Sequence, residues 1–165
     1  MQSGAAVPWE VAGQSQITVV VQSAAGSTSL NAAVANAAPG VFTLDSTGTG
    51  QAVAINRDGS LNGPTNPDAA GSYVSVYFTG GGITDPPGLT GSVDDLVVAN
   101  LALTATATVG GVAGTVTFAG PAPGFVGGVN EINILLSSNT PSGAEPLVIT
   151  VGGQSSSATA TIGVQ

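Results

Sequence analysis

The sequence contains no cysteine and no histidine, and its 165 residues include a single basic side chain, Arg57. A chain without thiols or imidazoles forms no disulfide and no zinc site of the usual nitrogen and sulfur type. Its many Ser and Thr hydroxyls also have no His, Lys or Cys that would activate them as nucleophiles. We therefore predict that the protein is not an enzyme and requires no cofactor.

Positive charge is almost absent, because nine acidic residues accompany the one arginine and the formal net charge is −8. Binding to nucleic acid requires several Lys or Arg side chains that displace counterions from phosphate. Binding to an anionic membrane surface requires them as well. The charge balance therefore predicts that neither nucleic acid nor a lipid surface is a partner.

Charged residues of either sign make up only 6% of the chain, whereas about 25% is usual for a globular domain. Uncharged polar residues must therefore provide solubility, as they often do in exported proteins. No run approaches 18 apolar residues, so we predict no membrane insertion. Residues 1–3 have neither the basic nor the apolar region of a signal peptide, and we expect any such peptide to have been removed. The predicted location is extracellular or at the cell surface.

Aromatic residues are few, at 4%, whereas 42% of the chain is hydrophobic, so Val, Ile, Leu and Ala must fill the core. These residues alternate with polar ones in short runs such as Tyr73–Phe78 and Leu147–Val151, a period typical of β-strands. Gly, Pro, Asn and Asp interrupt the runs every 8–12 residues or so, which is typical of a sandwich. The sequence predicts an all-β, immunoglobulin-like β-sandwich with strands at 16–22, 28–35, 51–57, 72–79, 96–109, 113–119, 129–136, 146–151 and 157–164.

Glycine pairs and an Asp-Gly pair mark the expected turns. Asp58-Gly59, Gly110-Gly111 and Gly152-Gly153 each favour a tight hairpin, because glycine adopts positive φ without strain. The proline-bearing stretches 62–70 and 80–91 are predicted to be loops. Residues 31–38 and 92–95 give weak indications of helix.

An internal repeat organises the chain. Ile17–Ala35 (ITVVVQSAAGSTSLNAAVA) is similar to Leu147–Val164 (LVITVGGQSSSATATIGV), and both read as a strand, a turn, a Ser-rich start and a second strand. The second copy follows a full set of strands, whereas the first has almost nothing before it. We therefore predict a complete module over residues 45–165 and an N-terminal half-module over residues 1–44. The half-module either packs against the complete module or is completed by another chain, and the second arrangement is the preferred one.

Three longer stretches carry a resemblance to a known family. They are Val7–Ser15, Ala38–Gln51, and Phe118–Asn130 together with 141–143 and 151–155. Together they resemble the C-terminal β-sandwich region of large secreted acidobacterial proteins, an uncharacterised family with tandem IPT/TIG-like modules. The resemblance covers nearly the whole chain, and it implies export and immunoglobulin-like modules but no activity and no functional residues. The chain departs from the pattern before Val7 and over 85–100.

Calcium is the one metal that a chain without Cys and His suits, because calcium takes oxygen ligands only. Asn56, Asp58 and Asn62 form an oxygen-rich stretch, although the spacing of an EF-hand and its distal glutamate are missing. A tight Asp-Gly turn explains the same residues and is the preferred interpretation. The adjacent pair Asp94 and Asp95 is a second candidate for calcium, but it does not suit a catalytic dyad because neighbours on a strand point to opposite faces.

Trp9 is the only tryptophan, and a ring that stacks on a sugar is its functional interpretation. Tyr73 and Tyr77 are four residues apart, so both lie on one face of a predicted strand, and they could act in the same way. Burial at the edge of a core, or pairing across strands, is the more common use of such rings and is the preferred interpretation.

The leading functional hypothesis is a non-enzymatic extracellular structural protein. It would assemble with copies of itself into a filament or surface array through β-strand complementation, because an incomplete sandwich exposes strand edges and apolar faces. The alternative is an adhesion module that presents loops such as 80–92 to a glycan or a surface protein. A third possibility is a spacer within a larger secreted protein.

Overall fold

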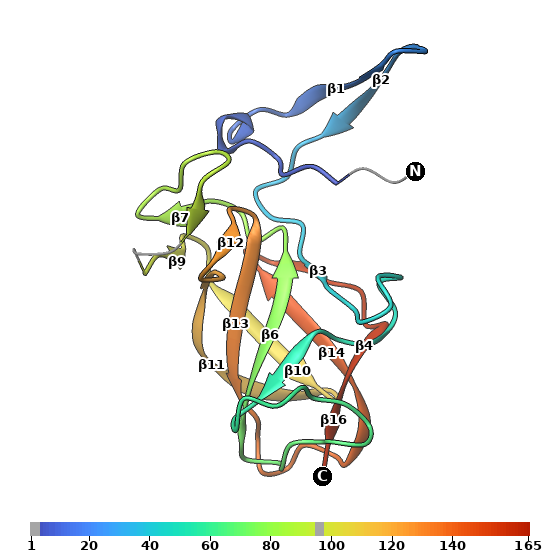
Figure 1. Ribbon diagram of the computed structural model, residues 1–165. Coiled ribbons are helices and arrows are strands. Elements are labelled where there is room, and N and C mark those ends of the chain that lie inside the picture. The colour runs from blue at the N-terminus through green and yellow to red at the C-terminus, as the bar shows by residue number, and fades with distance from the viewer. Residues whose placement is uncertain (1–3, 95–97) are drawn as a thin grey trace.

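The computed structural model describes residues 4–94 and 98–165, and these residues form an all-β protein. Its strands build curled sheets that enclose a core in the manner of a β-sandwich (Figure 1), so the predicted all-β class is confirmed. The immunoglobulin-like character of the sandwich stays a prediction. The helical content of the described residues is one 3-10 turn, η1 (Trp9–Val11), which the sequence did not predict.

The strands follow one another closely along the chain. In order they are β1 (Gln16–Ser23), β2 (Gly26–Ala33), β3 (Gly40–Val41), β4 (Gly50–Gln51), β5 (Ala54–Asn56), β6 (Tyr73–Thr79), β7 (Thr84–Asp85), β8 (Val93–Asp94), β9 (Asn100–Leu101), β10 (Ala105–Val109), β11 (Val112–Pro121), β12 (Phe125–Val126), β13 (Val129–Leu135), β14 (Gly143–Val151), β15 (Gln154–Ser155) and β16 (Ala160–Val164).

One sheet contains most of these strands, in the order β3-β6-β13-β11-β10-β14-β16-β4, with β5 also on β6 and β15 also on β14. The short segment 50–56 joins the two ends of this sheet. Ala52 donates its N–H to the Thr161 carbonyl of β16 at 2.8 Å, and Val53 accepts the N–H of Tyr77 on β6 at 3.1 Å. Adjacent residues therefore bond to opposite ends of the sheet, which curls it around the core.

Two long strands pass from one layer of the sandwich to the other. β11 pairs with β10 in its first half and with β13 in its second, and its register with β13 shifts between Val116 and Phe118. β14 pairs with β16 over residues 143–146 and with β10 over residues 147–151. A bulge of this kind bends a strand and increases its twist, so it suits the corner between layers.

Apolar side chains alternate with polar ones along the central strands, as the period of two predicts. Val74, Val76 and Phe78 of β6 are buried, whereas the residues between them lie on the outer face. The same alternation on β13, β14 and β16 adds most of the remaining core, which includes Ile132, Ile134, Leu147, Ile149, Val151 and Ile162. Aliphatic residues with a single buried phenylalanine, Phe78, thus fill the interior.

The sequence located the long strands and missed the short ones. The predicted strand 96–109 is wrong as a single element, because a bend at 102–104 separates β9 from β10 and residues 95–97 lie outside the described part. Both indications of helix are wrong over the described residues, since 31–33 belong to β2 and 93–94 to β8. The five missed strands, β3, β7, β8, β12 and β15, have two residues each, too few to show a period.

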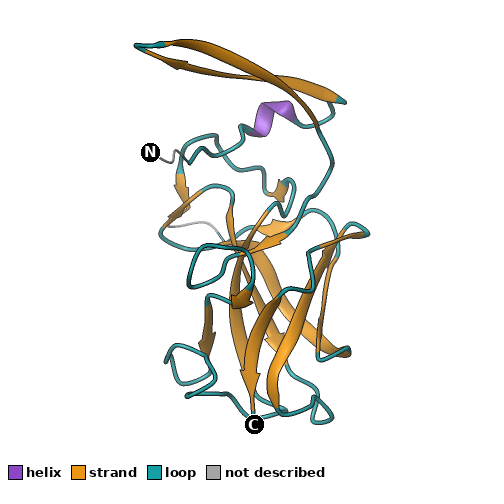
Figure 2. Cartoon of the chain, turned by 90° about the vertical axis from the view of Figure 1, so that its right-hand side faces the viewer, coloured by secondary structure: helices purple, strands orange, loops and turns teal. Residues whose placement is uncertain are grey.

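The hairpin β1–β2 stands away from the sandwich in both views of the chain (Figure 1 and Figure 2). Its two strands pair with each other alone, over eight residues each. The sandwich begins soon afterwards, because Ala37 is buried in its core and β3 pairs with β6. The segment outside the sandwich is thus shorter than the predicted half-module 1–44, whose boundary at residue 44 stays a prediction.

Candidate interaction surfaces

The projecting hairpin has one apolar and one polar face. Its register places Val19 opposite Leu30, Ile17 opposite Ala32, and Val21 opposite Thr28, and directly opposed residues of an antiparallel pair share a face. We call the set Ile17, Val19, Val21, Leu30 and Ala32 the hairpin face. The reverse side consists of polar residues together with Val20 and Ala33.

The hairpin face is open to solvent. Val19, Val21 and Leu30 are 43%, 60% and 69% exposed, respectively, and no part of the hairpin is fully buried. Both outer edges of the hairpin are also unpaired in the described chain, because each strand bonds only to the other. Such edges and faces are where a further strand adds.

The internal repeat shows what environment this sequence has elsewhere in the same molecule. Ile17, Val19 and Val21 correspond to Leu147, Ile149 and Val151 of β14, all of which are 0% exposed. There the strand has β10 on one side and packs its apolar face against the core. The first strand of the hairpin therefore has the apolar pattern of a core strand, but no core covers it in the described chain.

The base of the hairpin is attached to the loop that follows β7. Trp9 donates its backbone N–H to the Thr90 hydroxyl at 2.9 Å, and that hydroxyl donates to the Glu10 carboxylate at 2.6 Å. The second hydrogen bond lowers the pKa of Glu10 below its ordinary value. The half-buried indole of Trp9 lies so close to Gly88 that a side chain at that position would collide with it. Trp9 thus fastens the base of the hairpin to the loop.

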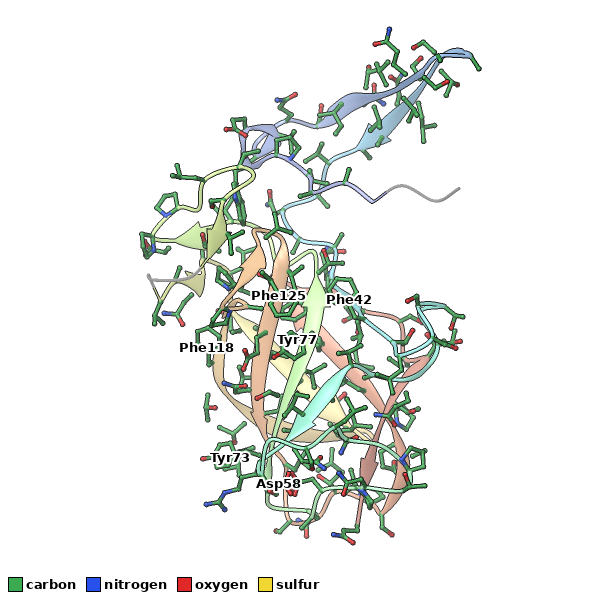
Figure 3. The ribbon with its side chains drawn as sticks, in the orientation of Figure 1. Phe42, Asp58, Tyr73, Tyr77, Phe118 and Phe125 are labelled. Atoms are coloured by element: carbon green, nitrogen blue, oxygen red, sulfur yellow. The ribbon has the colours of Figure 1, made fainter. Side chains whose placement is uncertain are left out.

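The three rings proposed for stacking are not brought together. Trp9 packs on Gly88, whereas Tyr73 begins β6 and Tyr77 lies four residues further along it, with Ser75 between them on the outer face. Figure 3 shows the two tyrosines well apart, with Tyr73 at the lower end of the strand. A stacking role for each ring stays a prediction, but a joint site made of these three is not formed.

Tyr77 instead has two phenylalanines as neighbours, which the sequence analysis did not select. Its ring centroid lies 5.7 Å from that of Phe125, and the rings are tilted by 50°. Phe42 lies beside Tyr77 on the edge of the sheet, because its N–H donates to the Tyr77 carbonyl at 3.1 Å. We call Phe42, Tyr77 and Phe125 the aromatic platform (Figure 3).

The aromatic platform points outward. Val41 packs against the core, so Phe42, the next residue, faces the opposite way. Phe42 is 37% and Phe125 49% exposed. Glu131 of β13 lies directly opposite Tyr77 on the same face. Burial, and then the negative charge of Glu131, raises the pKa of Tyr77 above its ordinary value of 10.0, so its hydroxyl stays protonated at neutral pH.

The residues proposed for calcium hold the loop after β5 in place through hydrogen bonds. The Asn62 amide donates to the Asn56 side-chain oxygen at 2.7 Å and to the Gly163 carbonyl at 2.9 Å, and its own oxygen accepts the Gly163 N–H at 2.7 Å. The Asp58 carboxylate accepts the N–H and the hydroxyl of Ser60, which lowers the pKa of Asp58. The expected tight turn is present, with Gly59 at a φ of 85°.

The remaining calcium candidates lie on β8. The Asp94 backbone pairs with Phe125 of β12, and Asp95 lies outside the described residues. Among the residues that the structure describes, no group of three or more acidic side chains could hold a metal ion. A role in calcium binding for Asn56, Asp58, Asn62, Asp94 and Asp95 stays a prediction.

Sequence reasoning missed Phe42 and Phe125 for an identifiable reason. Phe42 directly follows the two-residue strand β3, and Phe125 belongs to the two-residue strand β12, so no alternation indicates that either ring faces outward. The signal available was the repeat of Ala-Pro-Gly-Val-Phe at 38–42 as Ala-Pro-Gly-Phe-Val at 122–126, which contains both phenylalanines.

Comparison with family models, curated proteins and solved structures finds no match to this chain. Within the described part of the chain, no helix is long and apolar enough to cross a membrane. The arguments about function therefore depend on the hairpin face and the aromatic platform alone.

Proposed function

We propose that the protein is a non-enzymatic extracellular structural protein that assembles with copies of itself into a filament or surface array. In this proposal the hairpin β1–β2 is completed by strands of a neighbouring copy. The observation that supports it is the exposed hairpin face, whose Ile17, Val19 and Val21 correspond to fully buried residues of β14. In the same proposal, the complete module and the N-terminal half-module are immunoglobulin-like modules of the secreted family that the chain resembles.

Burial of the hairpin face would supply the free energy of association. Full burial of one Val, Leu or Ile side chain contributes about 1.5–3 kcal/mol, and the hairpin face has four such residues. A two-stranded hairpin is marginally stable by itself in water, so a covering layer would also stabilise its pairing. The exposed face therefore favours a state in which it is covered.

No charge opposes this contact. Residues 16–33 contain no Asp, Glu, Lys or Arg, although the whole chain carries a net charge of −8. Natural edge strands are commonly protected from pairing by charged residues, above all lysine. The hairpin has no such protection, and two copies could approach through it while their charged surfaces stay apart.

The neighbouring hairpin fits better as the partner than the core of another sandwich. Core side chains such as Ile149 and Ile162 are 0% exposed, and the segment 50–56 joins the two ends of the main sheet. A donated strand therefore finds no open groove there. Two hairpins can instead cover each other's apolar faces, and their unpaired edges can receive further copies, which allows open-ended growth.

The test compares lysine substitutions on the two sides of the hairpin. Val19→Lys with Val21→Lys places charge on the hairpin face and should abolish self-association in sedimentation velocity and remove any assemblies from negative-stain images. The matched control is Val20→Lys, because Val20 is as exposed as Val21 but lies on the reverse side. A parent protein that remains monomeric at millimolar concentration, or a Val20→Lys variant that dissociates equally, would contradict the proposal.

A further inference from the structure

We propose that the aromatic platform is a binding site for a neutral polysaccharide whose sugar rings carry equatorial substituents, such as a β-linked glucan or chitin. This inference goes beyond self-assembly, and it depends on a different surface from the hairpin face. It replaces the predicted stacking trio of Trp9, Tyr73 and Tyr77 with Phe42, Tyr77 and Phe125.

The geometry is a row of side chains across three strands. Phe42, Tyr77 and Glu131 lie side by side on the edge segment, on β6 and on β13, all on the outer face. Phe125 adds a second ring beside Tyr77, 5.7 Å from it. The main sheet holds the backbone of Tyr77 and Glu131, Phe42 bonds to its edge, and β8 pairs with β12 at Phe125. The backbone positions are thus fixed before a ligand binds, and a rigid site binds more tightly.

The chemistry of the row matches both sides of a sugar ring. A pyranose with equatorial hydroxyls presents an apolar C–H face and a rim of hydrogen-bonding groups, and aromatic rings pack against the apolar face. The Glu131 carboxylate accepts hydrogen bonds from hydroxyl groups, and the protonated Tyr77 hydroxyl can donate one. One row further along the same face, the Ser75 hydroxyl donates to the Asn133 side-chain oxygen, which continues the polar border.

The charge of the protein favours a neutral sugar. The one basic residue, Arg57, follows β5, whose Asn56 pairs with Val74 at the far end of β6 from Tyr77. Glu131 and the net charge of −8 would repel uronate or sulfate groups near the platform. Anionic polysaccharides are therefore expected not to bind.

Cellohexaose and chitohexaose are suitable probes, together with soluble β-glucan, insoluble cellulose and chitin, and polygalacturonate as the anionic comparison. Calorimetry with the hexasaccharides should show binding to the parent protein by at least one of them. Phe42→Ala and Phe125→Ala should each weaken it about tenfold, the effect of removing one aromatic contact of about 1.4 kcal/mol. Glu131→Gln should weaken binding less, because an amide oxygen still accepts a hydrogen bond.

Tyr73→Ala is the matched control, because Tyr73 is an exposed ring on the same face of β6 outside the platform. It should leave affinity unchanged, and circular dichroism with thermal melting should show every variant to be folded. Absence of binding to all neutral probes, stronger binding to polygalacturonate, or equal loss in Tyr73→Ala would overturn the proposal. Loss of self-association in Phe125→Ala without any effect on sugar affinity would identify the platform as a contact between copies instead.

The hairpin variant separates this inference from the proposed function. Val19→Lys with Val21→Lys should bind hexasaccharide with the affinity of the parent, because the substitutions lie on the projecting hairpin. A protein that binds sugar but stays monomeric refutes assembly alone, whereas one that assembles without binding sugar refutes the polysaccharide site alone.

Discussion

At the scale of single residues, Asn62 has the most completely bonded buried side chain of the loop region. It is 1% exposed, and its amide contacts Gln51, Asn56 and both backbone groups of Gly163. These bonds attach the loop after β5 to the last strand of the sheet. What the sequence presented as a possible calcium ligand is used in the structure as a bridge between distant segments.

We predict that Asn62→Ala lowers the free energy of unfolding by about 3 kcal/mol, because it removes the acceptor of the Gly163 N–H and the donor to the Asn56 side-chain oxygen in a buried site. The control is Asn66→Ala, since Asn66 also bonds within this loop but is exposed, and it should cost about 1 kcal/mol or less. Chemical denaturation measures both. Equal effects of the two substitutions would show that burial of Asn62 is not what matters.

At the scale of strands and turns, the outcome depends on the length of the element. Runs such as Tyr73–Thr79 and Val129–Leu135 are long enough to show alternation, and the sequence placed them within a residue. Short strands such as β3 and β12 form only where the rest of the fold brings the chain next to a partner strand. No local sequence pattern therefore predicts them. The same limit applies to the aromatic platform, because Phe42 directly follows the short β3 and Phe125 belongs to the short β12.

The turn between β10 and β11 provides a test at this scale. Gly110 and Gly111 have φ values of 57° and 77°, so alanine at either position is strained in the left-handed region by about 1 kcal/mol. A side chain at Gly110 would also collide with the Glu145 carboxylate and Pro141, whereas one at Gly111 would meet nothing.

We therefore predict that Gly110→Ala destabilises the protein more than Gly111→Ala, by about 1–2 kcal/mol beyond the shared strain. Thermal melting of the two variants gives the difference directly. If Gly111→Ala is the more harmful of the two, the turn has a different geometry from the one described.

At the scale of the whole molecule, the buried core begins at Ala37, and no buried residue precedes it among those described. The hairpin therefore contributes little to the stability of the sandwich. The repeat predicted this arrangement from Ile17 and Leu147, because it showed one strand pair without the strands that cover it. The repeat could not show where the base of the hairpin is attached, because that depends on the contact of Trp9 with the distant Gly88.

We predict that a chain lacking residues 1–35 folds and melts within a few degrees of the intact protein. It should lose self-association but keep its affinity for hexasaccharide, because Phe42, Tyr77 and Phe125 all remain. Sedimentation, melting and calorimetry on the shortened chain check the three points. Failure of the shortened chain to fold would show that the hairpin supports the sandwich after all.

The last strand also has a mechanical consequence. β16 runs parallel to β4, with Ala160 beside Gly50, and a parallel bridge joins Val164 to Asp68. Tension between Gly50 and Val164 pulls the two parallel strands along their length in opposite directions, so their hydrogen bonds are loaded together in shear. Bonds loaded in this way rupture collectively, whereas those of a hairpin pulled open at one end break one after another. A force applied between these two residues would therefore act first on this parallel pairing.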